Sequence, residues 1–241
     1  MHITVCGLRG GVGTTSIAAM LADALNILGE SVLVIDLNPS DLLRLHFNIP
    51  YADQQGWACA QAQGSDLQQH SYQVKDKLYV LPYGRHGVAG LDQDIQGFDI
   101  DIAGWSQHDL AAASGCAWVI FDLPHYDPRY QALRARSQLD FLVTHADAAS
   151  HILLGQYPLT PQTKILVNDL DVRQRLSDAV LLDWNIRYAA HLVPVRVRQD
   201  LHVQEAFAHK MPTTTYFPNA SSAADAMSLA TWCLVQRGVA R

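Results

Sequence analysis

Residues 7–16 read Gly-Leu-Arg-Gly-Gly-Val-Gly-Thr-Thr-Ser, and this stretch decides the fold of the chain. The apolar run 3–6 before it is typical of a buried strand, and the apolar stretch 17–28 after it is predicted to be a helix. The glycines of the stretch permit a tight turn and the close approach of phosphate oxygens. A glycine-rich loop between a strand and a helix N-terminus is a phosphate-binding loop, so we expect a nucleoside triphosphate as its ligand.

The loop lacks its usual lysine, because Thr14 occupies that position. Arg9 begins the glycine run, and its guanidinium is suited to bind a phosphate of its own site or of a second copy's site; the alternative is a solvated arginine. A charge-assisted hydrogen bond contributes about 1.5–3 kcal/mol. The loss of one such hydrogen bond is therefore expected to weaken phosphate binding about ten- to a hundredfold. Binding should survive this loss more easily than hydrolysis does, because the missing charge matters most where charge develops.

Composition is typical of one globular α/β domain over 1–241. The chain has 241 residues, of which 49% are apolar and 17% charged, and its net charge of −6 argues against a dedicated nucleic-acid binder. Four scattered cysteines argue against disulfides and zinc, and Cys6 and Cys116 are expected in the core. With no signal peptide and no apolar run long enough to cross a bilayer, we expect a cytoplasmic protein.

Strand and helix patterns alternate along the chain, which predicts a doubly wound, mostly parallel sheet. Continuous Val/Ile/Leu runs indicate strands covered on both faces. The glycine-rich segment 84–104 is expected to be a long surface loop. Strands are expected at 3–6, 31–36, 78–82, 118–122, 141–144, 164–168 and 191–194, and helices at 17–28, 127–138, 171–187 and 220–236.

Polar residues end three of these strands, at the sheet edge where ligands bind. The Thr15 hydroxyl is expected to bind Mg²⁺, and Asp122 is expected to hold the metal or its water shell, with Asp36 as a second acid. For both aspartates the alternative is a structural role, such as capping a helix. The Asn168 amide is suited to read a base edge, although a turn asparagine is the more ordinary interpretation of that residue.

Four motifs in order carry a family resemblance. Residues 9–16 resemble the deviant Walker A loop of the MinD/ParA ATPases, Lys-Gly-Gly-x-Gly-Lys-Thr-Thr. Residues 34–39 resemble that family's Asp-x-Asp-Pro element, 121–124 its second switch, and 194–232 its C-terminal part. The resemblance implies a P-loop fold, ATP with Mg²⁺, and a homodimer that holds ATP between its two copies. The nucleotide contacts expected on these grounds are Arg9, Gly10, Gly11, Val12, Gly13, Thr14, Thr15, Ser16, Asn168 and Pro194, and the metal contacts are Thr15, Asp36 and Asp122.

A narrower resemblance covers residues 9–15, 42–48, 55–58 and 230–234, which are similar to the MinD-like proteins of bacterial cellulose-secretion operons. That resemblance implies a regulatory or assembly subunit of the membrane-bound cellulose synthase machinery. It also implies a small operon-encoded partner protein. The few positive charges at the C-terminus predict that the chain reaches the membrane only through partners.

Three residues depart from the wider family pattern. Arg9 and Thr14 replace its two lysines, and Asn38 replaces the second aspartate, which is associated with positioning the attacking water. An amide supplies neither a carboxylate's charge nor a base. We therefore assign no catalytic residue and predict ATP binding with slow or negligible hydrolysis.

Three other functions remain as alternatives. An active ParA/MinD-type partitioning or positioning ATPase would bind DNA through Arg187, Arg196 and Arg198, against which the negative net charge weighs. A reductase of the nitrogenase-reductase type would need cysteines at a dimer face, but Cys116 precedes a strand instead of following one. A biosynthetic ligase would need a second substrate site, for which the sequence offers no candidate.

Overall fold

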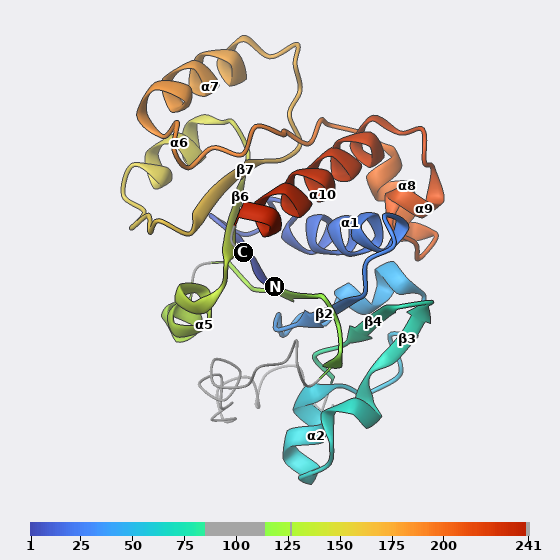
Figure 1. The fold of residues 1–241 in the computed structure, drawn as a ribbon. Helices are drawn as coiled ribbons and strands as arrows, with labels where there is room; N and C mark the ends of the chain where they lie inside the picture. The colour runs from blue at the N-terminus through green and yellow to red at the C-terminus, as the bar shows by residue number, and fades with distance from the viewer. Residues whose placement is uncertain (85–113, 126, 240–241) are drawn as a thin grey trace.

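The computed structural model describes residues 1–84, 114–125 and 127–239, the last without its final side chain. In it a seven-stranded sheet has the order β3-β4-β2-β5-β1-β6-β7, and every pair is parallel except β3 and β4 (Figure 1). The predicted fold class is therefore confirmed. The strands are β1 (His2–Gly7), β2 (Val32–Asp36), β3 (Tyr72–Lys75), β4 (Leu78–Leu81), β5 (Trp118–Asp122), β6 (Leu139–Thr144) and β7 (Thr163–Val167).

Two strand predictions were wrong. Residues 191–194, expected to be a strand, make only an isolated bridge between Leu192 and Ile165 of β7, so the ladder does not continue past β7. The edge strand β3 was missed because its residues alternate polar and apolar and are only partly buried, unlike the continuous apolar runs of the central strands.

Helices cover both faces of the sheet (Figure 1). On one face, α1 (Thr14–Ile27) and α10 (Ser221–Val239) lie side by side over the central strands and enclose the largest apolar cluster. On the other face, α2 (Trp57–Gln63) and α5 (Gln131–Arg136) pack on β2 and β5, and α6 (Ala148–Leu154) and α7 (Arg175–Arg187) pack on β6 and β7. The remaining described elements are α8 (His202–Ala208), α9 (Thr213–Tyr216) and the 3-10 turns η1 (Leu43–Phe47), η2 (Leu67–His70) and η3 (Pro128–Tyr130).

Each of the four segments predicted to be helical contains a helix, but the ends of these helices differ from the prediction. The first begins at Thr14 instead of residue 17, and the fourth extends to Val239. The helix expected over 127–138 is a 3-10 turn followed by the short α5, and the one expected over 171–187 begins at Arg175. The loop expected at 84–104 lies, beyond Gly84, outside the described residues.

Helix α10 packs on the body of the protein. Leu229 and Cys233 are buried against α1, and the Arg237 guanidinium binds the Glu30 carboxylate at 2.6 and 2.7 Å. Within the described ranges, no helix is both long enough and apolar enough to cross a membrane. Cys6 and Cys116 are buried, as expected.

Candidate nucleotide site

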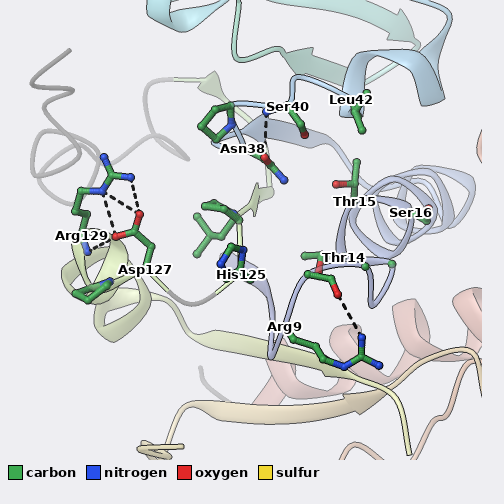
Figure 2. A pocket seen from close by; sticks show the side chains of 17 residues that line it. Arg9, Thr14, Thr15, Ser16, Asn38, Ser40, Leu42, His125, Asp127 and Arg129 are labelled. Carbon is green, nitrogen blue, oxygen red and sulfur yellow. Dashed lines mark hydrogen bonds and ion pairs between the residues drawn. The ribbon is translucent and has the colours of Figure 1, made fainter. Parts of the chain in front are cut away.

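A cavity of about 680 Å³ opens at the edge of the sheet where β1, β2 and β5 end (Figure 2). Three segments line it: the loop 9–16 after β1, the turn 38–42 after β2, and the connection 123–129 after β5. The sequence predicted the first segment and Asn38 of the second. These segments come together because the carboxyl ends of parallel strands share one edge of a sheet.

The glycine-rich loop turns sharply into α1. Gly11 and Gly13 have φ values of 79° and 84°, which only glycine adopts without strain, and Gly13 is the N-cap of α1. Thr14, Thr15 and Ser16 form the first turn of that helix and line the cavity. Their backbone N–H groups therefore stand at the N-terminus of α1, where a helix favours an anion.

Asn168 braces this loop. Its amide donates a hydrogen bond from Nδ2 to the Val12 carbonyl oxygen at 2.8 Å, across 156 positions of sequence. Val12 is fully buried and does not line the cavity, although it was predicted to contact the nucleotide. Asn168 was predicted to bind the edge of the base. In the structure it lies at the phosphate-binding loop, where one of its two amide N–H groups is already bound to the Val12 carbonyl oxygen.

Two aspartates lie below the loop. Asp36 and Asp122 end neighbouring strands as register partners, and both are fully buried. The Asp36 carboxylate accepts hydrogen bonds from the N–H groups of Asn38 at 2.9 Å and Leu43 at 3.2 Å, so it holds the turn that carries Asn38. Burial, together with the charges of Asp122 and Asp41, holds the pKa of Asp36 well above its usual range.

The Asp122 carboxylate differs, because it accepts no hydrogen bond from the backbone of the described residues. Among the described residues no donor reaches either of its carboxylate oxygens in hydrogen-bonding geometry, although the carboxylate is fully buried. Burial raises the pKa of Asp122 to about 7, and the nearby Thr15 hydroxyl opposes that rise. A buried carboxylate left without a partner needs an explanation, and a cation with its water shell supplies one.

The donors present fit a magnesium ion that arrives with a nucleotide. Within the described residues, no three His, Cys, Asp or Glu side chains gather into a metal site. Mg²⁺ is commonly bound through one or two protein oxygens together with phosphate oxygens and waters. The Thr15 hydroxyl and the Asp122 carboxylate are such oxygens, whereas Asp36 already accepts two backbone hydrogen bonds.

Arg9 lines the cavity but is engaged elsewhere. Its guanidinium binds the Asp147 carboxylate at 2.7 Å, and the two side chains are 34% and 36% exposed. Asp147 is the N-cap of α6 and also accepts the Ser150 N–H at 2.7 Å. Burial raises the pKa of Asp147, but the Ser150 and Arg9 hydrogen bonds outweigh it, so the net shift is downward and the pair is ionised.

Sequence reasoning missed part of the cavity wall. Pro194, predicted to contact the nucleotide, is exposed and does not line this cavity, so that contact stays a prediction. The missed residues were not predicted as nucleotide contacts, although the resemblance to the family's motifs covers Pro39, Leu123 and Pro124. They are Pro39, Ser40, Leu42, Leu123, Pro124, His125, Asp127, Pro128 and Arg129.

The basic patch considered for DNA binding is largely neutralised. Arg187 binds the Asp183 carboxylate at 2.8 Å, and Arg198 binds Asp225 through two nitrogens at 2.8 and 2.9 Å. Arg196 contacts an amide oxygen at 3.4 Å. Two of the three arginines therefore already have a carboxylate partner.

The fold is that of known P-loop ATPases. A ParA family ATPase from Chlorobium tepidum superposes with a TM-score of 0.74 at 18% identity, covering 95% of this chain and 98% of the other. The septum site-determining protein MinD from Pyrococcus horikoshii, solved with Mg-ADP, gives 0.70 at 19% identity, covering 95% and 93%. At these identities the likeness extends to the fold alone.

Closer relatives are similar in sequence over nearly the whole chain. The cellulose biosynthesis protein BcsQ of Salmonella typhimurium is 34% identical over 232 residues, covering 95% of this chain and 92% of that protein. The protein of the same name from Escherichia coli is 35% identical over 237 residues, with the same coverage. The family model described as cellulose biosynthesis protein BcsQ matches residues 1–234. The chain therefore belongs to the BcsQ family.

Proposed function

We propose that this protein binds ATP with Mg²⁺ in the cavity at the sheet edge and forms a homodimer around it. In that state it serves as a regulatory or assembly subunit of the bacterial cellulose synthase secretion machinery. The partners are other subunits of that machinery, including a small protein from the same operon, and they connect the chain to the inner membrane. The family supports the cellulose role, because its members carry the name cellulose biosynthesis protein.

One observation carries the nucleotide proposal: the carboxylate of Asp122 is fully buried beneath a P-loop, with only the nearby Thr15 hydroxyl to favour its charge and no well-formed hydrogen bond among the described residues. Desolvating a carboxylate is costly unless a cation or donors compensate it. Mg²⁺, when bound, would be held by the Asp122 carboxylate and the Thr15 hydroxyl and would neutralise that charge. The MinD and cobyrinic acid a,c-diamide synthase structures of this fold, which hold Mg-ADP and an ATP analogue with magnesium, support that ligand.

Slow hydrolysis is proposed from the groups that face the expected phosphates. Thr14 offers a hydroxyl where the family's lysine would supply a charge, and Asn38 offers an amide instead of a carboxylate. Asn38 lines the cavity, and its side-chain oxygen accepts the Ser40 N–H at 3.1 Å (Figure 2). The amide is thus engaged in holding its own turn and cannot accept a proton from water.

Equilibrium binding tests this proposal directly. Titration calorimetry with ATP, in the presence and absence of Mg²⁺, should give a saturable, Mg²⁺-dependent signal. Phosphate release measured on the same protein should be slow or absent. No binding at millimolar ATP would overturn the proposal, and rapid multiple turnover would replace it with an active partitioning or positioning ATPase.

A further inference from the structure

His125 is an unoccupied donor on the wall that faces the phosphate loop. Figure 2 shows its imidazole pointing into the cavity, between Asn38 and the loop that carries Thr14. In the described part of the chain, no hydrogen bond, ion pair or ring contact engages this side chain. The imidazole is therefore available to a ligand.

The two described arginines of the cavity each bind a carboxylate. Arg9 binds Asp147 at 2.7 Å, on the far side of the loop. Arg129 binds Asp127 through Nε at 2.9 and 3.1 Å and through a terminal nitrogen at 2.6 Å, and these hydrogen bonds hold the pKa of Asp127 below its usual range. A phosphate would have to displace a carboxylate from Arg129, and Arg9 is held toward Asp147 by one terminal nitrogen although its Nε has no partner among the described residues, whereas His125 requires neither exchange nor movement away from a carboxylate.

The backbone that carries His125 is fixed to the strand that leads into the loop. The Leu123 N–H donates to the Val5 carbonyl oxygen at 2.9 Å, and the Cys6 thiol donates to the Pro124 carbonyl oxygen at 3.3 Å. Burial raises the pKa of Cys6 to about 12, so the thiol keeps its proton and remains a donor. His125 therefore begins one residue beyond a carbonyl held at the mouth of the phosphate loop.

We infer that His125 binds the terminal phosphate of ATP and supplies a nitrogen donor in place of the ammonium that Thr14 lacks. This inference rests on the proposed nucleotide function and adds a specificity-determining residue to it. Backbone N–H groups of a P-loop cradle the inner phosphates, so the last phosphate projects toward the facing wall. A donor on that wall distinguishes ATP from ADP, because only ATP has a phosphate there to bind.

The test compares ATP and ADP affinities of wild type, H125A and H125Q by titration calorimetry with Mg²⁺. Removing the imidazole should weaken ATP binding about tenfold or more while changing ADP affinity less than threefold, because a hydrogen bond to a charged group is lost only for ATP. The ATP affinity of H125Q, which keeps an N–H donor, should lie between those of wild type and H125A. H209A removes an exposed histidine that stacks on Tyr216 outside the cavity, and it should match wild type.

A second variant links His125 to the missing lysine. If both groups serve the same phosphate, T14K should strengthen ATP binding more in the H125A background than in wild type. If H125A lost equal affinity for ATP and ADP, or lost none, the assignment of His125 to the terminal phosphate would be overturned. Wild type that fails to bind either nucleotide would instead overturn the proposed function, so the two failures are distinguishable.

Discussion

Asp36 and Asp122 are register partners at the ends of two adjacent parallel strands, and both carboxylates are fully buried. Only Asp36 accepts hydrogen bonds from the backbone. Burial raises the pKa of each, to about 7 for Asp122. At neutral pH these buried carboxylates therefore destabilise the ligand-free protein, and a bound cation would remove that destabilisation.

This pair predicts an unusual dependence of stability on pH. A carboxyl that titrates near 7 when folded and near 4 when unfolded binds more protons in the folded state, so the free energy of unfolding falls as pH rises between those values. D122N should therefore stabilise the ligand-free protein at pH 8 by up to a few kcal/mol, and this gain should disappear near pH 4. Urea denaturation at both pH values measures it.

Asp171 provides the control of opposite sign. Its pKa is lowered to about 2 by the Arg173 guanidinium, so its contribution to stability is present above pH 4 and is lost as the pH falls. D171N should therefore not gain stability at pH 8. A D122N protein that is no more stable than wild type at pH 8 would contradict the description of Asp122 as a poorly compensated buried charge.

The contact between Gly13 and Asn168 predicts which glycine of the loop is indispensable. A Cβ on Gly13 would lie 2.4 Å from Asn168 Nδ2, whereas a Cβ on Gly11 would meet nothing within 4 Å. Both residues have positive φ, so alanine costs about 1 kcal/mol of backbone strain at either position. G13A should lose more stability and more ATP affinity than G11A, because it also displaces Asn168 from the Val12 carbonyl.

A double variant separates the two costs of G13A. N168A removes the clash but also removes the brace, so G13A should be less damaging in the N168A background than in wild type. Thermal melts and ATP titrations of the four proteins give this coupling. Strictly additive losses would show that Asn168 does not restrain the loop.

The fold and the phosphate-binding loop could be predicted because the sequence signals for them are local. The glycines after β1 and the continuous apolar strands each specify one conformation, and they predicted six of the seven strands. Asp36, Asp122 and Thr15 were placed correctly at one edge because parallel strands fix which ends come together. What could not be predicted depends on side-chain partners distant in sequence. Two such cases are the hydrogen bond from Asn168 to the Val12 carbonyl and the ion pair between Arg9 and Asp147.

The Arg9–Asp147 ion pair predicts that one carboxylate competes with phosphate for Arg9. D147N keeps a good N-cap for α6 but removes the competing charge, so ATP affinity should rise by up to about fivefold, the value of a half-exposed ion pair. D147A should additionally destabilise the protein by about 0.5–2 kcal/mol through loss of the cap. Weaker ATP binding in D147N would show that Asp147 positions Arg9 for the nucleotide instead of restraining it.

Restoring the two missing family groups predicts a gain of hydrolysis. T14K should strengthen ATP binding about ten- to a hundredfold, and T14K/N38D should raise the rate of phosphate release at least tenfold above wild type. N38D alone should change ATP affinity little. A wild-type rate equal to that of the double variant would mean that neither Thr14 nor Asn38 limits the reaction.

The proposed function requires that ATP with Mg²⁺ joins two copies of this chain. Size-exclusion chromatography with light scattering, run with and without ATP and Mg²⁺ and followed by identification of the nucleotide in the peak, measures this association. We expect a monomer without nucleotide and a dimer that retains intact ATP and Mg²⁺. A monomer under every condition, with no nucleotide recovered, would contradict it.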